Sequence, residues 1–351
     1  MWRKLRWALI VSVAFGIGLL PAFGVGAAEK GKTASPSTRQ ASSGAAKKKT
    51  VAARQLSKQA GVPKKKVAPA ARAGSATRPR GEQLLAVMSG SALVVEQGGG
   101  GALYQKNAAV VVPIASITKL MTAMVVLDAI PDLQARITIS DDDVDYLRGS
   151  RSRLSVGAFM TRETALLLAL MSSENRAAHA LGRHYPGGMP AFLAAMNAKA
   201  QSLGMQDTHF EDPTGLTSRN VSTANDLAKM VSAAYSYPLI REFSTTTEAT
   251  VDVAGRQLAF HNTNPLVRNA AWDVGLSKTG YIQEAGKCLV MQARVADRPV
   301  VIVLLDSVGR LTRVGDANRI KRWMEQNIHA ARPVPPQAAA VKATLSSVRP
   351  G

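Results

Sequence analysis

Two polar side chains, Ser116 and Lys119, stand three residues apart at the start of an apolar segment with helical spacing. Residues at this spacing share one face of a helix, so the hydroxyl and the amine can come within hydrogen-bond reach. A serine hydroxyl becomes a nucleophile when a neighbouring group accepts its proton, and a lysine can accept it when burial or a second cation lowers its pKa. The pair alone is not specific, because a helix cap followed by a surface lysine has the same spacing. The pair therefore points to nucleophilic catalysis by a serine only in combination with further motifs.

Two further short motifs follow in the order described for penicillin-interacting serine enzymes. Residues 173–175, Ser-Glu-Asn, separate two apolar helical segments. Polar groups at such a junction are costly unless they are used. Residues 278–280, Lys-Thr-Gly, come at the end of a predicted strand. Each triplet is common by itself, but a chance match of all three motifs in this order is improbable.

The chain resembles the low-molecular-mass penicillin-binding proteins, which are serine D-alanyl-D-alanine peptidases, and in particular their D-alanyl-D-alanine endopeptidase branch. Four segments carry the resemblance: residues 113–124, 171–178, 184–188 and 278–281. It extends over residues 83–330 and is specific in combination. It implies a penicillin-binding-protein and serine β-lactamase-like fold, in which helices flank an antiparallel sheet and form a helical subdomain.

The resemblance also implies the catalytic residues. Ser116 would attack the carbonyl group between two D-amino acids and form an acyl-enzyme, with Lys119 as the general base. Ser173 would relay a proton to the leaving amine, and Asn175 would orient Lys119 and bind the substrate amide. Water would then release the acyl group.

The three residues of the third motif and the tyrosine that follows them are implied in substrate binding. Lys278 would hold anionic substrate charge and depress the pKa of Lys119, and Thr279 would bind a carboxylate or an amide. Gly280 would let the substrate strand lie close. The backbone N–H group of Tyr281, with that of Ser116, would form the oxyanion hole.

One position separates this chain from the class A β-lactamases. Their second motif has aspartate in the middle, where this chain has Glu174. No residue can be matched to their deacylating glutamate, and we expect Glu163 and Glu211 to be structural. We therefore expect β-lactams to act as covalent inhibitors whose adducts are released slowly.

The order of the predicted strands and helices that carry these residues indicates an α+β fold. Apolar patterning begins with strands at 84–88, 92–95 and 102–105, continues with helices from 116 to 235, and returns to strands at 249–306 before a closing helix at 314–328. Strands at both ends of a helical middle are typical of α+β domains.

The ends of the chain differ from the middle in composition. Residues 1–28 have the basic, apolar and small-residue layout of a signal peptide, so we expect an exported, periplasmic protein without an integral membrane anchor after cleavage. Residues 29–82 are expected to form a disordered basic spacer, because this stretch lacks aromatic residues. The peptidase domain would occupy residues 83–330, followed by a Pro/Ala-rich tail at 331–351.

Charge and cysteine content exclude other classes. The net charge of +20 comes mainly from residues 29–80, whereas residues 81–351 hold 27 basic and 23 acidic residues. Nucleic-acid binding by the domain therefore lacks its usual electrostatic support. With Cys288 as the single cysteine and no metal-binding spacing among the histidines, we expect neither a metal nor a cofactor.

The sequence favours an endopeptidase that cleaves peptidoglycan crosslinks between D-alanine and a diamino acid. A carboxypeptidase would use the same residues, and the tail lacks the amphipathic anchor often attached to carboxypeptidases of this family. A non-catalytic penicillin-binding scaffold and a true β-lactamase remain as rivals. The oligomeric state stays open.

Overall fold

The computed structural model describes residues 85–98, 101–129 and 131–328. The predicted signal peptide, the basic spacer and the tail at 331–351 lie outside these residues. Within them, no helix has both the length and the apolar character needed to cross a membrane.

A five-stranded antiparallel sheet forms the centre of the domain, with strand order β2-β1-β11-β10-β9. Its central strands are buried over almost their whole length rather than at alternate positions. Such continuous burial means that both faces of the sheet are covered. The strands are β1 (Ser91–Glu96), β2 (Ala102–Lys106), β9 (Asp273–Ile282), β10 (Gly286–Val295) and β11 (Arg298–Ser307).

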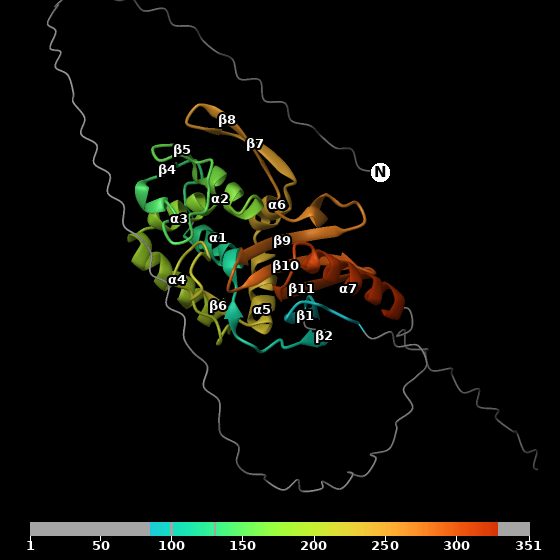
Figure 1. Ribbon diagram of the computed structural model, residues 1–351. Coiled ribbons are helices and arrows are strands. Elements are labelled where there is room, and N and C mark those ends of the chain that lie inside the picture. The colour runs from blue at the N-terminus through green and yellow to red at the C-terminus, as the bar shows by residue number, and fades with distance from the viewer. Residues whose placement is uncertain (1–84, 99–100, 130, 329–351) are drawn as a thin grey trace, which may run out of the picture. The chain divides into compact units, whose positions relative to one another are not determined.

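Helices cover the two faces of this sheet (Figure 1). Helix α7 (Thr312–Ile328) packs on β10 and β11, and helix α5 (Ala224–Ala234) packs on β1, β10 and β11 from the other side. Side chains of neighbouring strand positions, such as Val303 and Leu304, accordingly belong to two different apolar clusters. The arrangement confirms the predicted α+β class.

A second group of helices packs around α1, which carries Lys119 at its first position. These helices are α1 (Lys119–Asp128), α2 (Arg162–Met171), α3 (Asn175–Arg183), α4 (Gly188–Ser202) and α6 (Pro238–Thr245). Helix α1 is buried along almost its entire length. Its methionines, Met121 and Met124, are core residues.

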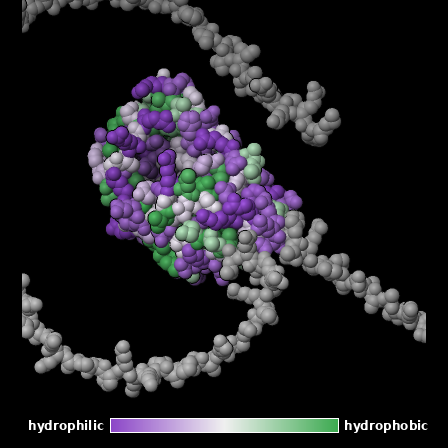
Figure 2. All heavy atoms as spheres, turned by 45° about the vertical axis from the view of Figure 1, so that its right-hand side comes forward, coloured by the Kyte–Doolittle hydropathy of each residue, from purple (hydrophilic) through white to green (hydrophobic). Residues whose placement is uncertain are grey.

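Three short pairs of strands complete the fold: β3 (Val112–Pro113) with β6 (Val221–Ser222), β4 (Arg136–Thr138) with β5 (Phe159–Thr161), and β7 (Glu248–Val253) with β8 (Arg256–His261). The β7–β8 hairpin projects from the domain beside β4 and β5 (Figure 1). On the face shown in Figure 2, hydrophobic residues are scattered among hydrophilic ones.

The strand predicted at 84–88 is wrong for the described residues of that segment, which form no strand. The backbone N–H groups of Met88 and Ser89 donate instead to the carboxylate of Asp316, at 3.0 and 2.7 Å. Asp316 is fully buried in α7. A side chain 227 positions away thus takes the place of a neighbouring strand, which local alternation cannot reveal.

The helix predicted from residue 116 begins differently. Residues Ala115–Thr118 form a 3-10 turn, η1, and the α-helix starts at Lys119. The turn follows β3 directly, and Ala115 has a positive φ of 47°. Ser116 therefore lies on a tight bend rather than inside a regular helix.

Candidate active site

Ser116 is half-buried on the η1 turn, between two glycines that lie close to it. A Cβ atom at Gly215 would lie 1.9 Å from the carbonyl oxygen of Ala115, and one at Gly280 would lie 3.0 Å from the Ser116 nitrogen. Gly215 also has a φ of +80°, which favours glycine. Two segments distant in sequence thus fix the turn that presents the Ser116 hydroxyl.

Lys119 is completely buried, and its amine has a hydrogen-bond acceptor on each of three sides. Nζ lies 3.1 Å from the Ser116 Oγ, 2.7 Å from the Asn175 Oδ1 and 2.7 Å from the carbonyl oxygen of Thr214. Burial lowers the pKa of Lys119 to about 8, against the raising effect of nearby carboxylates, Asp212 first among them. A useful fraction of this lysine is therefore neutral near neutral pH, as a general base requires.

The segment that links α2 to α3 positions Ser173 and Asn175. Ser173 has a φ of +62°, a strained conformation for a residue with a side chain, and such strain concentrates at functional sites. Asn175 begins α3, and its Nδ2 donates to the Ser150 Oγ at 3.0 Å while its Oδ1 accepts from Lys119. These two hydrogen bonds fix the orientation of the Asn175 side-chain amide.

Strand β9 carries the third motif along one side of the site. Lys278 is buried, and its Nζ donates to the Ser173 Oγ at 2.8 Å and to the carbonyl oxygen of Thr279 at 3.0 Å. Burial lowers the pKa of Lys278 well below its usual value, with a further lowering by the charges of Lys119 and Arg313. The Thr279 hydroxyl lies 2.6 Å from that of Thr263, at the end of the β7–β8 hairpin.

Packing between remote segments shapes two features of the site. Burial is the cause that lowers the pKa of Lys119. A Cβ atom at Gly280 would meet Ile114, Ala115 and Ser116, so the absent side chain lets β9 approach the Ser116 turn.

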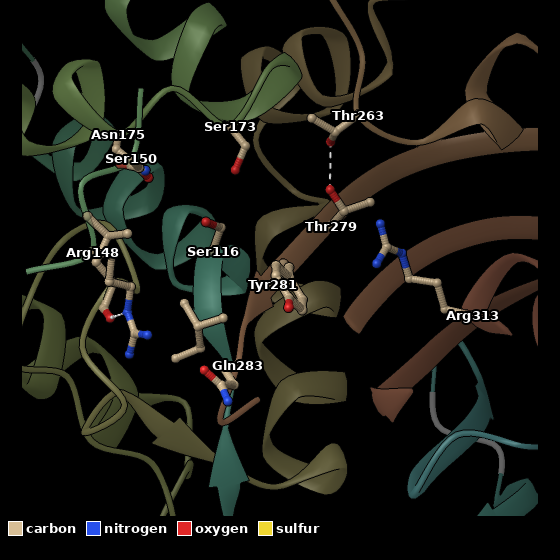
Figure 3. A pocket seen from close by; sticks show the side chains of 13 residues that line it. Ser116, Arg148, Ser150, Ser173, Asn175, Thr263, Thr279, Tyr281, Gln283 and Arg313 are labelled. Atoms are coloured by element: carbon tan, nitrogen blue, oxygen red, sulfur yellow. Dashed lines mark hydrogen bonds between the residues drawn. The ribbon is translucent and has the colours of Figure 1, made fainter. Parts of the chain in front are cut away.

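These groups meet at an open cavity of about 560 Å³ (Figure 3). Six of the eight predicted residues line it: Ser116, Ser173, Asn175, Thr279, Gly280 and Tyr281. Lys119 and Lys278 lie beneath its surface, where each donates a hydrogen bond to a serine of the lining. The structure thus brings all eight residues together.

No carboxylate is among the described residues that line the cavity. Glu174 is absent from the lining and accepts a hydrogen bond from Ser152, while Glu163 accepts one from Gln134. Glu211 forms an ion pair with Arg219 outside this cavity. The part of the chain that the structure describes also contains no group of histidine, cysteine or acidic residues that could hold a metal ion.

Arg313 is one of the lining residues that sequence reasoning missed, together with Arg148, Ser150, Leu216, Thr263, Ile282 and Gln283. It lies in the first turn of α7, and its Nε and Nη1 atoms are buried without a hydrogen-bond partner among the described residues. Burial also lowers the pKa of Arg313 below its usual value. The sequence did contain a signal for this residue: Arg313 is a cation at the start of a predicted helix, where the positive end of the helix dipole disfavours it. An unpartnered guanidinium beside an open cavity suits an anionic ligand.

The family described as D-alanyl-D-alanine carboxypeptidase matches residues 76–309 of this chain. The chain belongs to that family. This confirms the resemblance to low-molecular-mass penicillin-binding proteins that the motifs of the sequence indicate.

Two relatives named D-alanyl-D-alanine endopeptidase are similar to this chain over most of its length. It is 49% identical over 252 residues to a D-alanyl-D-alanine endopeptidase of Pseudomonas aeruginosa, covering 71% of this chain and 81% of the relative. It is 45% identical over 278 residues to a D-alanyl-D-alanine endopeptidase of Escherichia coli, covering 79% and 87%.

Solved structures confirm the fold of the family. The crystal structure of the Streptomyces K15 DD-transpeptidase superposes with a TM-score of 0.64 at 30% identity, covering 68% of this chain and 97% of that one. A D-alanyl-D-alanine carboxypeptidase from Mycobacterium tuberculosis gives a TM-score of 0.64 at 26% identity, covering 74% and 97%. The fold is thus the penicillin-binding-protein type expected from the motifs.

Proposed function

We propose that this protein is a serine D-alanyl-D-alanine endopeptidase that hydrolyses peptidoglycan crosslinks between D-alanine and a diamino acid through an acyl-enzyme. The observation that carries the proposal is the 3.1 Å contact between the Ser116 Oγ and the buried amine of Lys119. A hydroxyl is activated when a base of suitable pKa lies within hydrogen-bond reach.

Acylation follows from this contact. Ser116 Oγ attacks the D-alanine carbonyl carbon while its proton passes to neutral Lys119. Asn175 and the carbonyl oxygen of Thr214 hold the lysine in place, since both accept hydrogen bonds from it. The backbone N–H groups of Ser116 and Tyr281 would stabilise the oxyanion, a contribution whose loss costs on the order of a hundredfold or more in rate.

Ser173 and Lys278 would then serve the leaving amine. The Ser173 Oγ accepts a hydrogen bond from Lys278 Nζ and lines the cavity. It would relay to the amine, as the C–N bond breaks, the proton that Lys119 took from Ser116, and Lys119 becomes neutral again. Lys278 is occupied by its hydrogen bond to Ser173 and does not line the cavity. We therefore assign the carboxylate beside the scissile nitrogen to Arg313 and Thr279.

Hydrolysis of the acyl-enzyme completes the cycle. Water adds to the ester carbonyl and its proton passes to neutral Lys119. Lys119 then returns this proton to the Ser116 Oγ as the ester C–O bond breaks, so that both groups regain their starting states. The lining has no carboxylate that could act as a dedicated base for this water. We therefore propose that β-lactams, whose adducts keep the leaving group attached, remain on Ser116 as inhibitors.

Identity with relatives supports endopeptidase rather than carboxypeptidase action. The two relatives named endopeptidase are 49% and 45% identical to this chain, whereas those named carboxypeptidase from Bacillus subtilis and Streptomyces are 31% and 32% identical. We further propose a periplasmic location, reached through the signal peptide of residues 1–28, because the substrate lies in the cell wall.

Intact-protein mass spectrometry with a penicillin tests the acyl-enzyme step. The full chain should gain the mass of one penicilloyl group and lose it slowly, and Ser116→Ala should gain none. Rapid turnover of a chromogenic cephalosporin without a persistent adduct would instead identify a β-lactamase.

A further inference from the structure

The active-site cavity extends from Ser116 in two directions (Figure 3). Arg313 lies on one side of Thr279, while Arg148 lies on the opposite side of Ser116 and Gln283 lies below Ser116 in this view. Arg148 also lines a neighbouring cavity of about 580 Å³, together with Glu284. The site therefore continues well beyond the residues that carry out the chemistry.

Arg148 and Glu284 present opposite charges at this far end. Arg148 Nη2 lies 3.0 Å from the Glu284 Oε1, and the two side chains are 23% and 47% exposed. Arg148 Nε donates to the carbonyl oxygen of Leu216 at 2.5 Å. Among the described residues, Nη1 of Arg148 and Oε2 of Glu284 take part in no hydrogen bond. The pair thus keeps unused hydrogen-bonding capacity at the Arg148 Nη1 and at the Glu284 Oε2.

The direction of the substrate follows from the proposed function, on which this inference rests. The leaving amino acid carries its carboxylate beside the scissile nitrogen, and that carboxylate goes to Arg313. The acyl-donor stem must leave Ser116 on the other side, toward Arg148 and Glu284. The residue that precedes D-alanine in this stem is itself a diamino acid, whose side chain ends in an ammonium group, with or without a carboxylate on the same carbon.

We propose that Arg148 and Glu284 form a subsite for the zwitterionic end of a diamino dicarboxylic acid in the acyl-donor stem. Arg148 would bind the carboxylate with its planar fork, and Glu284 would bind the ammonium group. The ligand would add to the existing ion pair and create an alternating arrangement of four charges.

The pair has little other reason to exist as a stabilising element. An ion pair with this exposure contributes little to folding, because solvent screens both charges. The hydrogen bond to Leu216 holds the guanidinium of Arg148 in place independently of Glu284.

Three synthetic crosslinked peptides test the subsite on the full-length protein. They differ only in the residue before the donor D-alanine: meso-diaminopimelate with both charges free, lysine with the ammonium alone, or norleucine with neither. The variants are Arg148→Gln and Glu284→Gln. The control is Glu96→Gln, which breaks a comparable ion pair with Arg298 at the opposite end of the sheet.

The expected kcat/KM decreases in the order diaminopimelate, lysine, norleucine. Arg148→Gln should remove the advantage of diaminopimelate over lysine, about tenfold for one charge-assisted contact. Glu284→Gln should lower kcat/KM for both charged peptides relative to norleucine, and Glu96→Gln should leave all ratios unchanged. If either subsite variant lowers kcat/KM by the same factor for all three peptides, the proposal is overturned and Arg148 and Glu284 have a structural role.

A second readout separates this inference from the endopeptidase proposal. The same peptides compete with a fluorescent penicillin for Ser116. Competition that follows the charge order without cleavage would mean that the subsite exists and the endopeptidase proposal fails. Cleavage with no charge order in either assay would mean the reverse.

Discussion

Gly280 lies against the backbone of Ser116, so the third motif supports the nucleophile directly. A Cβ atom at Gly280 would stand 3.0 Å from the Ser116 nitrogen and 3.0 Å from the carbonyl oxygen of Ile114. Strand β9 and the η1 turn are therefore packed to backbone contact, which is the position where we place the oxyanion hole.

Gly280→Ala should slow acylation by penicillin about tenfold or more while the domain stays folded. The added methyl group must push the Ser116 turn away by a few tenths of an ångström, and oxyanion stabilisation depends on such small distances. Stopped-flow acylation rates check this. Gly101→Ala is the control, because a Cβ there meets nothing within 4 Å. Equal rates for Gly280→Ala and the parent would contradict the account.

The pH dependence of acylation should follow Lys119. A base acts when it is unprotonated, and burial lowers the pKa of Lys119 to about 8. The acylation rate should therefore rise about tenfold per pH unit below this value and level off above it. Lys119→Met should abolish the rise together with the activity. A rate that is flat from pH 6 to 9 would show that another group is the base.

Arg313→Gln should weaken recognition of the substrate carboxylate. We expect kcat/KM to fall by a factor of about 10 to 100, which corresponds to a hydrogen bond to a charged group of about 1.5–3 kcal/mol. Peptides with an amide in place of that carboxylate should be cleaved equally by the parent and by the variant. An equal loss on both kinds of peptide would indicate a structural role for Arg313.

Asp316→Ala should lower the free energy of unfolding by about 3 kcal/mol or more. The carboxylate of Asp316 accepts hydrogen bonds from the backbone of Met88 and Ser89 and pairs with Arg319. Loss of a buried charged partner leaves these donors unsatisfied. Urea denaturation measures the change, and Asp252→Ala on the exposed β7 strand is the control. A change below 0.5 kcal/mol, within the ordinary range of surface substitutions, would exclude this anchoring role.

The parts of the site that the sequence predicts are those carried by local motifs. Ser116 and Lys119 share one turn, and the segments containing Ser173 and Lys278 have helical or strand periodicity around them. Their association in space comes from the resemblance to a family, because no local pattern relates residues that are more than 50 positions apart.

The parts that the sequence does not predict depend on contacts between remote segments. Arg313 stands in the first turn of a helix, which is an unfavourable place for a cation, but only the packing of α7 on the sheet brings it to the cavity. The strand expected near Met88 does not form because a carboxylate in α7 satisfies its backbone. Arg148 and Glu284 are adjacent only when the turn between β9 and β10 meets the loop that follows η2.

Mass spectrometry of purified muropeptides tests the central claim most directly. Crosslinked dimers and pentapeptide monomers are incubated together with the full-length protein or with Ser116→Ala. The account predicts that the parent alone converts dimers to monomers. Loss of one terminal alanine with intact dimers would identify a carboxypeptidase, and no change in either substrate would contradict the peptidase mechanism and favour a penicillin-binding scaffold.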